Sequence, residues 1–139
     1  LRLEKGYRVW GSDITPEDNP YEAGLGFAVS LDKGEDFIGK SALLRAKEAG
    51  PSRRLRALLL DDPQAIVFGG EPVRADGAVL GRVTSGGYGY TLERSIAYAY
   101  LSAGPGVGGR VEVQIFGRWV PATISKEPLY DPAGSRIRA

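Results

Sequence analysis

One carboxylate in this chain has neighbours that suit it to ligand binding. Glu22 ends the run Asn19-Pro20-Tyr21-Glu22, in which Asn19 can cap a helical turn and Pro20 suits its first position. A carboxylate accepts two hydrogen bonds at once, so Glu22 could bind N–H donors of a ligand. It could instead accept a hydrogen bond from the Asn19 amide and close a capping box. Both interpretations stay open on these residues alone.

Aromatic side chains that could cover the face of a ligand ring lie close to Glu22 in the sequence. They are Tyr7, Trp10 and Tyr21. Each of them could equally pack into a core. Tyr88 lies further along, in the glycine-rich and aromatic run 85–90, and is a weaker candidate. That run could also stack bases, but the net charge of only +1 argues against a nucleic-acid surface.

Basic residues mark the junction near the middle of the chain. Arg53, Arg54 and Arg56 follow Pro51 and Ser52. Their guanidinium groups could bind ligand carboxylates, or they could form the solvated face of a strand. Both interpretations are open for this cluster.

Composition excludes several kinds of chemistry. The chain has no histidine and no cysteine, so it lacks the most frequent acid–base group, disulfides and thiolate ligands. Its carboxylates do not follow a metal-binding spacing, and we predict no metal site and no catalytic residue. No apolar run approaches the roughly 20 residues that span a bilayer. Methionine is also absent, and the chain starts LRLEKG, so we expect the C-terminal part of a longer protein.

The first 50 residues indicate a small α+β piece. Residues 1–5 read as the last turn of a helix that Gly6 ends, and Ser41 to Ala49 as a helix that Gly50 ends. Between them, residues 27–31 alternate like a short strand.

From Arg53 onward the pattern is that of short strands separated by turns. Asp76-Gly77 and Phe116-Gly117 are typical hairpin turns, and the even spacing predicts an antiparallel β-barrel. The run 104–109 matches G-x-G-x-x-G, but it leads into a strand and not a helix, so we interpret it as a loop. The last residues, 131–139, read as a polar surface tail. The predicted strands are 54–60, 65–68, 71–74, 79–84, 87–92, 96–101, 110–116 and 119–125.

Three ordered blocks of this sequence resemble a known family. They are LRLEKGYRVWGSDIT, NPYEAGLGFAVSLDKGEDFIGKSAL and VTSGGYGYTLERSIAYAYL. The chain resembles the C-terminal part of the glycine-cleavage T-protein (aminomethyltransferase) family, and most of all the branch fused to dimethylglycine and sarcosine dehydrogenases. The resemblance implies that residues 1–52 are the truncated end of a folate-binding domain. Residues 53–139 would be the C-terminal β-barrel.

The resemblance also implies a cofactor and a role for Glu22. Glu22 stands where the family's glutamate binds the pterin ring of tetrahydrofolate, and an arginine near Arg53 or Arg54 would meet the folate tail. The module would pass a one-carbon unit from an amine or iminium carrier to tetrahydrofolate. FAD would belong only to a fused or partner dehydrogenase. The family's catalytic aspartate lies in a segment that this chain lacks, so we expect no turnover from the chain alone.

The expected partners are folate, the missing N-terminal or flavin portion and, through an exposed domain face, a second copy of the chain. We expect no nucleic acid and no membrane, and a cytoplasmic protein or, in a eukaryote, one of the mitochondrial matrix. An alternative function is a non-catalytic β-barrel that docks on a larger enzyme through its arginine edge and aromatic strands.

Overall fold

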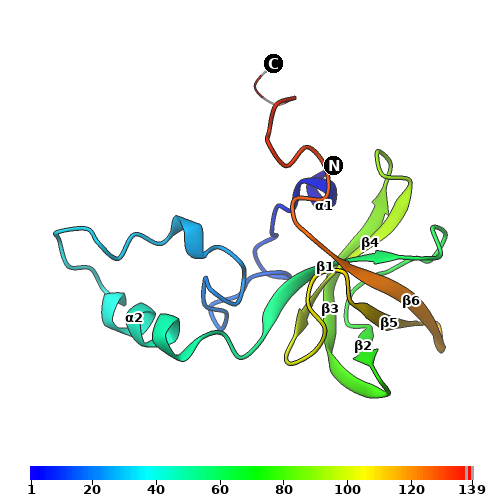
Figure 1. Cartoon of the computed structure of the whole chain (residues 1–139), viewed down its shortest axis with the longest axis horizontal. Helices are drawn as coiled ribbons and strands as arrows, with labels where there is room; N and C mark the ends of the chain where they lie inside the picture. The colour runs from blue at the N-terminus through cyan, green and yellow to red at the C-terminus, as the bar shows by residue number, and fades with distance from the viewer. Residues whose placement is uncertain (137, 139) are drawn as a thin grey trace.

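A closed six-stranded antiparallel barrel forms the body of the protein (Figure 1). The computed structural model describes residues 1–136 and 138. Around the barrel the strands follow the order β1-β4-β3-β2-β5-β6, and β6 pairs back with β1. The predicted antiparallel barrel after a short helical piece is therefore confirmed. In chain order the elements are α1 (Arg2–Lys5), the 3₁₀ turn η1 (Gly26–Ala28), α2 (Lys40–Ala49), β1 (Arg54–Leu60), β2 (Pro72–Ala75), β3 (Ala78–Gly89), β4 (Arg94–Leu101), β5 (Arg110–Ile115) and β6 (Arg118–Ser125).

Strand β4 is buried on both faces, because the barrel interior fills one face and the N-terminal segment covers the other. On the outer face, the Tyr98 hydroxyl donates a hydrogen bond of 2.9 Å to the Leu3 carbonyl. The Tyr100 hydroxyl donates one of 3.0 Å to the Asp13 carbonyl. Each buried tyrosine thus has a partner for its polar end. The inner set of β4 is Ala97, Ala99 and Leu101, and the outer set is Ile96, Tyr98 and Tyr100.

The hairpin turns at Asp76-Gly77 and Phe116-Gly117 join β2 to β3 and β5 to β6, as predicted. Residues 102–109 form the loop between β4 and β5, so the G-x-G-x-x-G run leads into a strand, also as predicted. The predicted strands at 79–84 and 87–92 are joined in one strand, β3, which ends at Gly89. A bulge in β3 shifts its register against β4 between Val83 and Ser85.

Two predicted strands are wrong. Residues 27–31 begin in η1 and continue as irregular backbone, because no strand in the described part of the chain pairs with them and Phe27 stays 87% exposed. Residues 65–68 form no ladder because local groups take their hydrogen bonds. The Ala65 amide donates to the Asp62 carbonyl, and the Phe68 amide donates to Glu71.

Helix α1 is joined to the barrel by Glu4, whose side chain is almost fully buried. Its carboxylate accepts hydrogen bonds from the amides of Thr91 (2.7 Å) and Leu92 (3.1 Å), just after β3. Burial raises the pKa of Glu4, but these amides, the Thr91 hydroxyl and the terminal amino group together lower it below its ordinary value. Gly6 ends α1 with φ 74°, a conformation that glycine adopts at little cost, as the sequence predicts.

The start of the C-terminal segment is not a free surface tail, and that prediction is wrong for Asp131. Lys5 Nζ lies 3.3 Å from Asp131 Oδ2, and the side chains of both are mostly buried. The Tyr130 amide also donates a 2.9 Å hydrogen bond to the Glu4 carbonyl. The segment after β6 is therefore attached to α1, while Ile137 and Ala139 lie outside the described residues.

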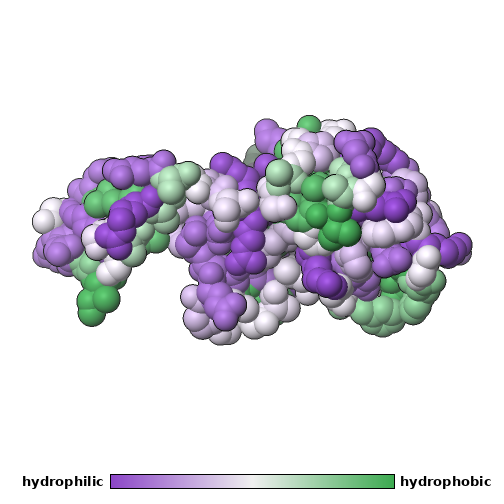
Figure 2. Space-filling view, turned by 90° about the horizontal axis from the view of Figure 1, so that it is seen from below, coloured by the Kyte–Doolittle hydropathy of each residue, from purple (hydrophilic) through white to green (hydrophobic). Residues whose placement is uncertain are grey.

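Residues 27–50 project away from the barrel and carry α2 (Figure 1). No residue of α2 is buried. Figure 2 shows this projection as a lobe that extends from the body and carries apolar surface along its lower side. Leu1 is exposed as well, whereas Leu25 is half-buried. No helix among the described residues has the length and apolar character needed to cross a bilayer.

The projecting segment should be the first part that a protease cuts. We expect trypsin to cleave first after Lys33, Arg45 and Lys47, which are exposed and lie in the lobe outside the barrel. Residues 53–125 should survive as a β-rich core, with residues 1–24 still bound to it. Mass spectrometry of a digestion time course checks this, and early cuts within 78–125 would contradict the division of the chain at residues 52 and 53.

The Glu4 contacts should make stability depend on pH. Because folding lowers the pKa of Glu4, its contribution is complete above the ordinary value of 4.5 and is lost as pH falls through the folded value. We expect Glu4→Gln to lower the free energy of unfolding by about 2 kcal/mol at pH 7, the usual size for hydrogen bonds to a charged group.

Urea unfolding of both proteins from pH 3 to pH 7 measures this difference. It should shrink towards pH 3, and a difference independent of pH would contradict the role of the ionised carboxylate. The pKa of Glu127, which burial raises against the influence of Arg8, affects both proteins alike and cancels in the comparison.

Candidate functional site

The turn that holds Glu22 is built by two side-chain caps. Asn19 Oδ1 accepts hydrogen bonds of 3.0 Å from the amides of both Tyr21 and Glu22, so the predicted cap is present. Upstream, the Thr15 amide and hydroxyl donate to Asp18 Oδ2 at 2.7 and 2.9 Å. The turn does not continue as a helix, and Gly24 follows with φ 72°.

The Glu22 side chain points to the junction with the barrel and is only 10% exposed. Its Oε1 accepts a 3.1 Å hydrogen bond from the Ser52 hydroxyl, and its Oε2 lies 3.5 Å from Arg53 Nε. Among the described residues it forms no hydrogen bond with the Asn19 amide, so the capping-box alternative does not hold in this structure. The Glu22 carbonyl accepts a 2.8 Å hydrogen bond from the Leu55 amide, which fixes the turn against β1.

Arg53 lies between two carboxylates. Its Nη2 is 2.7 Å from Asp18 Oδ1, much closer than its Nε is to Glu22. Its guanidinium carbon lies 4.6 Å from the centroid of the Tyr100 ring, a cation–π distance. Burial, with the nearby charge of Asp18, raises the pKa of Tyr100 to about 12 against the opposing influence of Arg53. We call Asp18, Arg53 and Glu22 the junction group.

Asp13, earlier in the same segment, fixes that N-terminal segment to the barrel. It is fully buried, and both of its carboxylate oxygens accept hydrogen bonds. Oδ1 accepts from the hydroxyls of Thr84 (2.5 Å) and Ser85 (2.7 Å), and Oδ2 accepts from Arg2 Nη1 and the Val9 amide, both at 3.0 Å. Adjacent strand residues normally point to opposite faces, and the β3 bulge lets Thr84 and Ser85 reach one carboxylate.

The other predicted residues lie in separate places. Tyr21 and Arg54 line a hollow of about 330 Å³ together with Lys47. Tyr7 lines a second hollow, of about 600 Å³, beside Arg8 and Phe27. Trp10 is 70% exposed.

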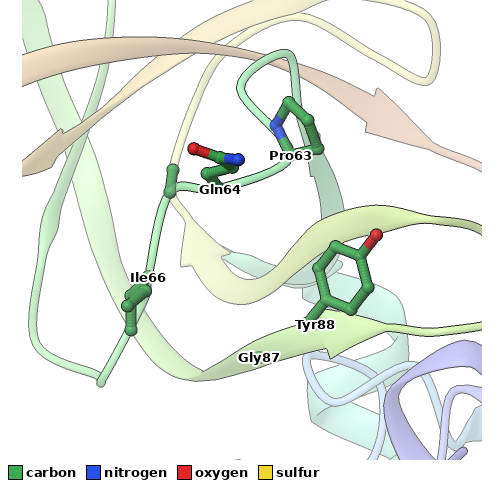
Figure 3. A pocket seen from close by; sticks show the side chains of 6 residues that line it. Pro63, Gln64, Ile66, Gly87 and Tyr88 are labelled. Atoms are coloured by element: carbon green, nitrogen blue, oxygen red, sulfur yellow. The ribbon is translucent and has the colours of Figure 1, made fainter.

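Tyr88 lies apart from the rest. It lines a third hollow, of about 470 Å³, between β3 and residues 63–66, and Figure 3 shows its ring beside Pro63 and Gln64. Its ring also meets Tyr90 edge-on, with 5.1 Å between centroids. No residue of this hollow lines the two that contain Tyr7, Tyr21 and Arg54.

Sequence reasoning missed three residues of this region: Asp13, Asp18 and Ser52. Thr15 and Asp18 stand three residues apart, the spacing of a reciprocal cap, and that signal could have found Asp18. Nothing local to Asp13 marks it, because its partners Thr84 and Ser85 lie 71 and 72 residues away. Among residues 1–136 and 138, no three or more carboxylates gather in a way that could hold a metal ion.

The fold belongs to the class of closed antiparallel barrels that carry an additional N-terminal segment on their outer face. The family profile of the glycine cleavage T-protein C-terminal barrel domain matches residues 53–131, and that of the GCVT N-terminal domain matches residues 1–33. The chain therefore belongs to the glycine cleavage T-protein family, as the sequence blocks indicate.

Similar proteins include a dimethylglycine dehydrogenase, in agreement with the branch that the sequence blocks suggest. The chain is 45% identical to 4-methylaminobutanoate oxidase (formaldehyde-forming) of Paenarthrobacter nicotinovorans, over 99% of its own length and 17% of that protein. It is 43% identical to the mitochondrial dimethylglycine dehydrogenase of Mus musculus, over 99% of this chain and 16% of that one. The chain thus spans about a sixth of these relatives.

A solved structure shares the fold. The crystal structure of glycine cleavage system aminomethyltransferase T from Bartonella henselae matches with a TM-score of 0.86 and 31% identity. The match covers 95% of this chain and 37% of that one.

Removing the charge of Asp13 should destabilise the whole protein. Asp13→Asn leaves Arg2 without its charged partner and directs the amide hydrogens of Asn toward groups that are themselves donors. We therefore expect the free energy of unfolding to fall by about 3 kcal/mol, as for other broken buried pairs. Urea unfolding measures this, and Asp62→Asn on an exposed barrel loop is the control. A loss below about 1 kcal/mol would show that Asp13 does not hold the segment in place.

Proposed function

We propose that this chain is the C-terminal portion of a tetrahydrofolate-dependent aminomethyltransferase-like module, in an enzyme related to the dimethylglycine and sarcosine dehydrogenases. The observation that carries the proposal is the Glu22 carboxylate, which is mostly buried yet, among the described residues, not saturated with hydrogen bonds. A carboxylate has about four acceptor positions, and Glu22 uses one for Ser52. Arg53 lies too far from it, at 3.5 Å, for a short hydrogen bond.

These free acceptor positions fit the pterin of tetrahydrofolate. The ring presents an exocyclic N–H and a ring N–H side by side, and Glu22 could accept both. Arg53 is already paired with Asp18. Arg54, by contrast, is exposed and lines a hollow with Tyr21 and Lys47. Of the two arginines we therefore assign the folate tail to Arg54. Bound tetrahydrofolate would accept the one-carbon unit, and this chain's part is to bind and orient it.

The rest of the enzyme belongs to the same proposal. The upstream part would supply the catalytic carboxylate, and FAD would reside in a fused or partner dehydrogenase, as the names of two relatives suggest. That upstream part would cover the exposed apolar side chains of the projecting lobe, such as Phe27 and Ile38. Without it we expect self-association through the same lobe. The compartment would be the cytoplasm, or the mitochondrial matrix in a eukaryote.

The alternative, a docking module with a basic edge, has less support. It needs the arginines at the junction to face solvent as a group. Arg53, although its side chain is 40% exposed, is instead held by Asp18 and stacks on Tyr100, while Arg56 is half-buried and only Arg54 of the three is fully at the surface.

The substitution Glu22→Gln in the full-length enzyme tests the proposal. It keeps the size of the side chain but replaces one carboxylate oxygen by an NH₂ group. That group would face an N–H donor of the pterin and could not accept its hydrogen bond. Two charge-assisted hydrogen bonds in a partly closed site contribute about 3 kcal/mol. We therefore expect affinity for 5-formyltetrahydrofolate to fall about 100-fold, at 1.4 kcal/mol for each factor of ten.

Fluorescence titration measures the affinity, and the thermal midpoint of each preparation shows whether folding is intact. Glu17→Gln, an exposed site on the same segment, is the matched control and should bind folate normally. Unchanged affinity in Glu22→Gln would refute the assignment of Glu22 to the pterin.

A further inference from the structure

The junction group contains a carboxylate whose role goes beyond binding Arg53. Asp18 is nearly buried, with a side chain 7% exposed, and both of its oxygens are in use. The Thr15 amide and hydroxyl both donate to Oδ2, so the orientation of the Asp18 carboxylate does not depend on Arg53. Oδ1 then accepts the 2.7 Å hydrogen bond from Arg53 Nη2.

Within the junction group, Arg53 is closer to Asp18 than to Glu22. A guanidinium beside two carboxylates could pair in two-pronged fashion with either of them. Here Arg53 is bonded to Asp18 at 2.7 Å, while its Nε stays 3.5 Å from Glu22 Oε2. The Tyr100 ring lies against its guanidinium at 4.6 Å and limits its movement. Arg53 thus gives Glu22 a nearby positive charge without filling its acceptor positions.

We propose that Asp18 is a positioning residue for the folate site: it holds Arg53 away from Glu22, so that the Glu22 carboxylate stays open to a ligand's N–H donors. This inference rests on the proposed function of Glu22. Asp18 itself does not touch the ligand and acts only through Arg53. Without the Asp18 charge, Arg53 turns to the nearest remaining carboxylate and closes a two-pronged pair with Glu22. The ligand must then compete with Arg53.

A double substitution in the full-length enzyme tests the positioning role of Asp18. Asp18→Asn should lower the affinity for 5-formyltetrahydrofolate about tenfold, because Arg53 then occupies Glu22. Adding Arg53→Gln to Asp18→Asn removes the competing guanidinium and should restore most of that loss. Thr15→Val removes one of the two Thr15 hydrogen bonds to Asp18 and should give a smaller loss, about twofold. Glu17→Gln is again the control.

The outcomes separate this inference from the proposed function. If Glu22→Gln weakens binding but Asp18→Asn does not, Glu22 binds folate and the positioning role is refuted. If the double variant binds as weakly as Asp18→Asn, or more weakly, then Asp18 or Arg53 contacts the ligand directly and the inference fails. If neither Glu22→Gln nor Asp18→Asn changes the affinity, both proposals fail together. Thermal midpoints of all variants show that each one is folded, and Thr15→Val still tests the inference if Asp18→Asn does not fold.

Discussion

The buried carboxylate of Asp13 holds the N-terminal segment, and with it the candidate site, against the barrel. An ionised group in a protein interior is stable only when its hydrogen bonds are complete, and Asp13 receives one from each of four groups. Two of these donors come from the N-terminal segment and two from β3. The carboxylate thus joins pieces of the chain that are far apart in sequence. The segment it holds carries Asp18 and Glu22, so the position of the candidate site follows from this contact.

The outer face of β4 explains why the N-terminal segment is part of the barrel's stability. Tyr98 and Tyr100 would expose large rings if the segment were absent, and their hydroxyl groups would lose the Leu3 and Asp13 carbonyls. Arg8 and Arg53 lie over the two rings, at 5.6 and 4.6 Å from their centroids. The same arrangement, an arginine over a tyrosine ring, therefore occurs twice along the outer face of β4. Only the second arrangement includes the junction group.

The sequence predicts most of the barrel because its signals are local. Alternating strands and the turns at Asp76-Gly77 and Phe116-Gly117 need only neighbouring residues to be recognised. Residues 27–31 were misassigned because alternation without a partner strand gives no ladder. In the site, the Asn19 cap and the position of Glu22 could be predicted. The pairing of Arg53 could not, because it depends on Asp18 and Tyr100, which lie 35 residues upstream and 47 residues downstream.

The bulge in β3 has a consequence for how this barrel can vary. Side chains alternate along a strand, so adding or removing one residue turns every later side chain to the opposite face. In β3 the one extra residue at Thr84 is what brings two successive hydroxyls to Asp13. Changes of length should therefore be rare between 78 and 89 among proteins that keep this contact, even where the residue types change freely. In the exposed loop at 32–38 no described contact with the barrel depends on the number of residues, so the loop is free to differ in length.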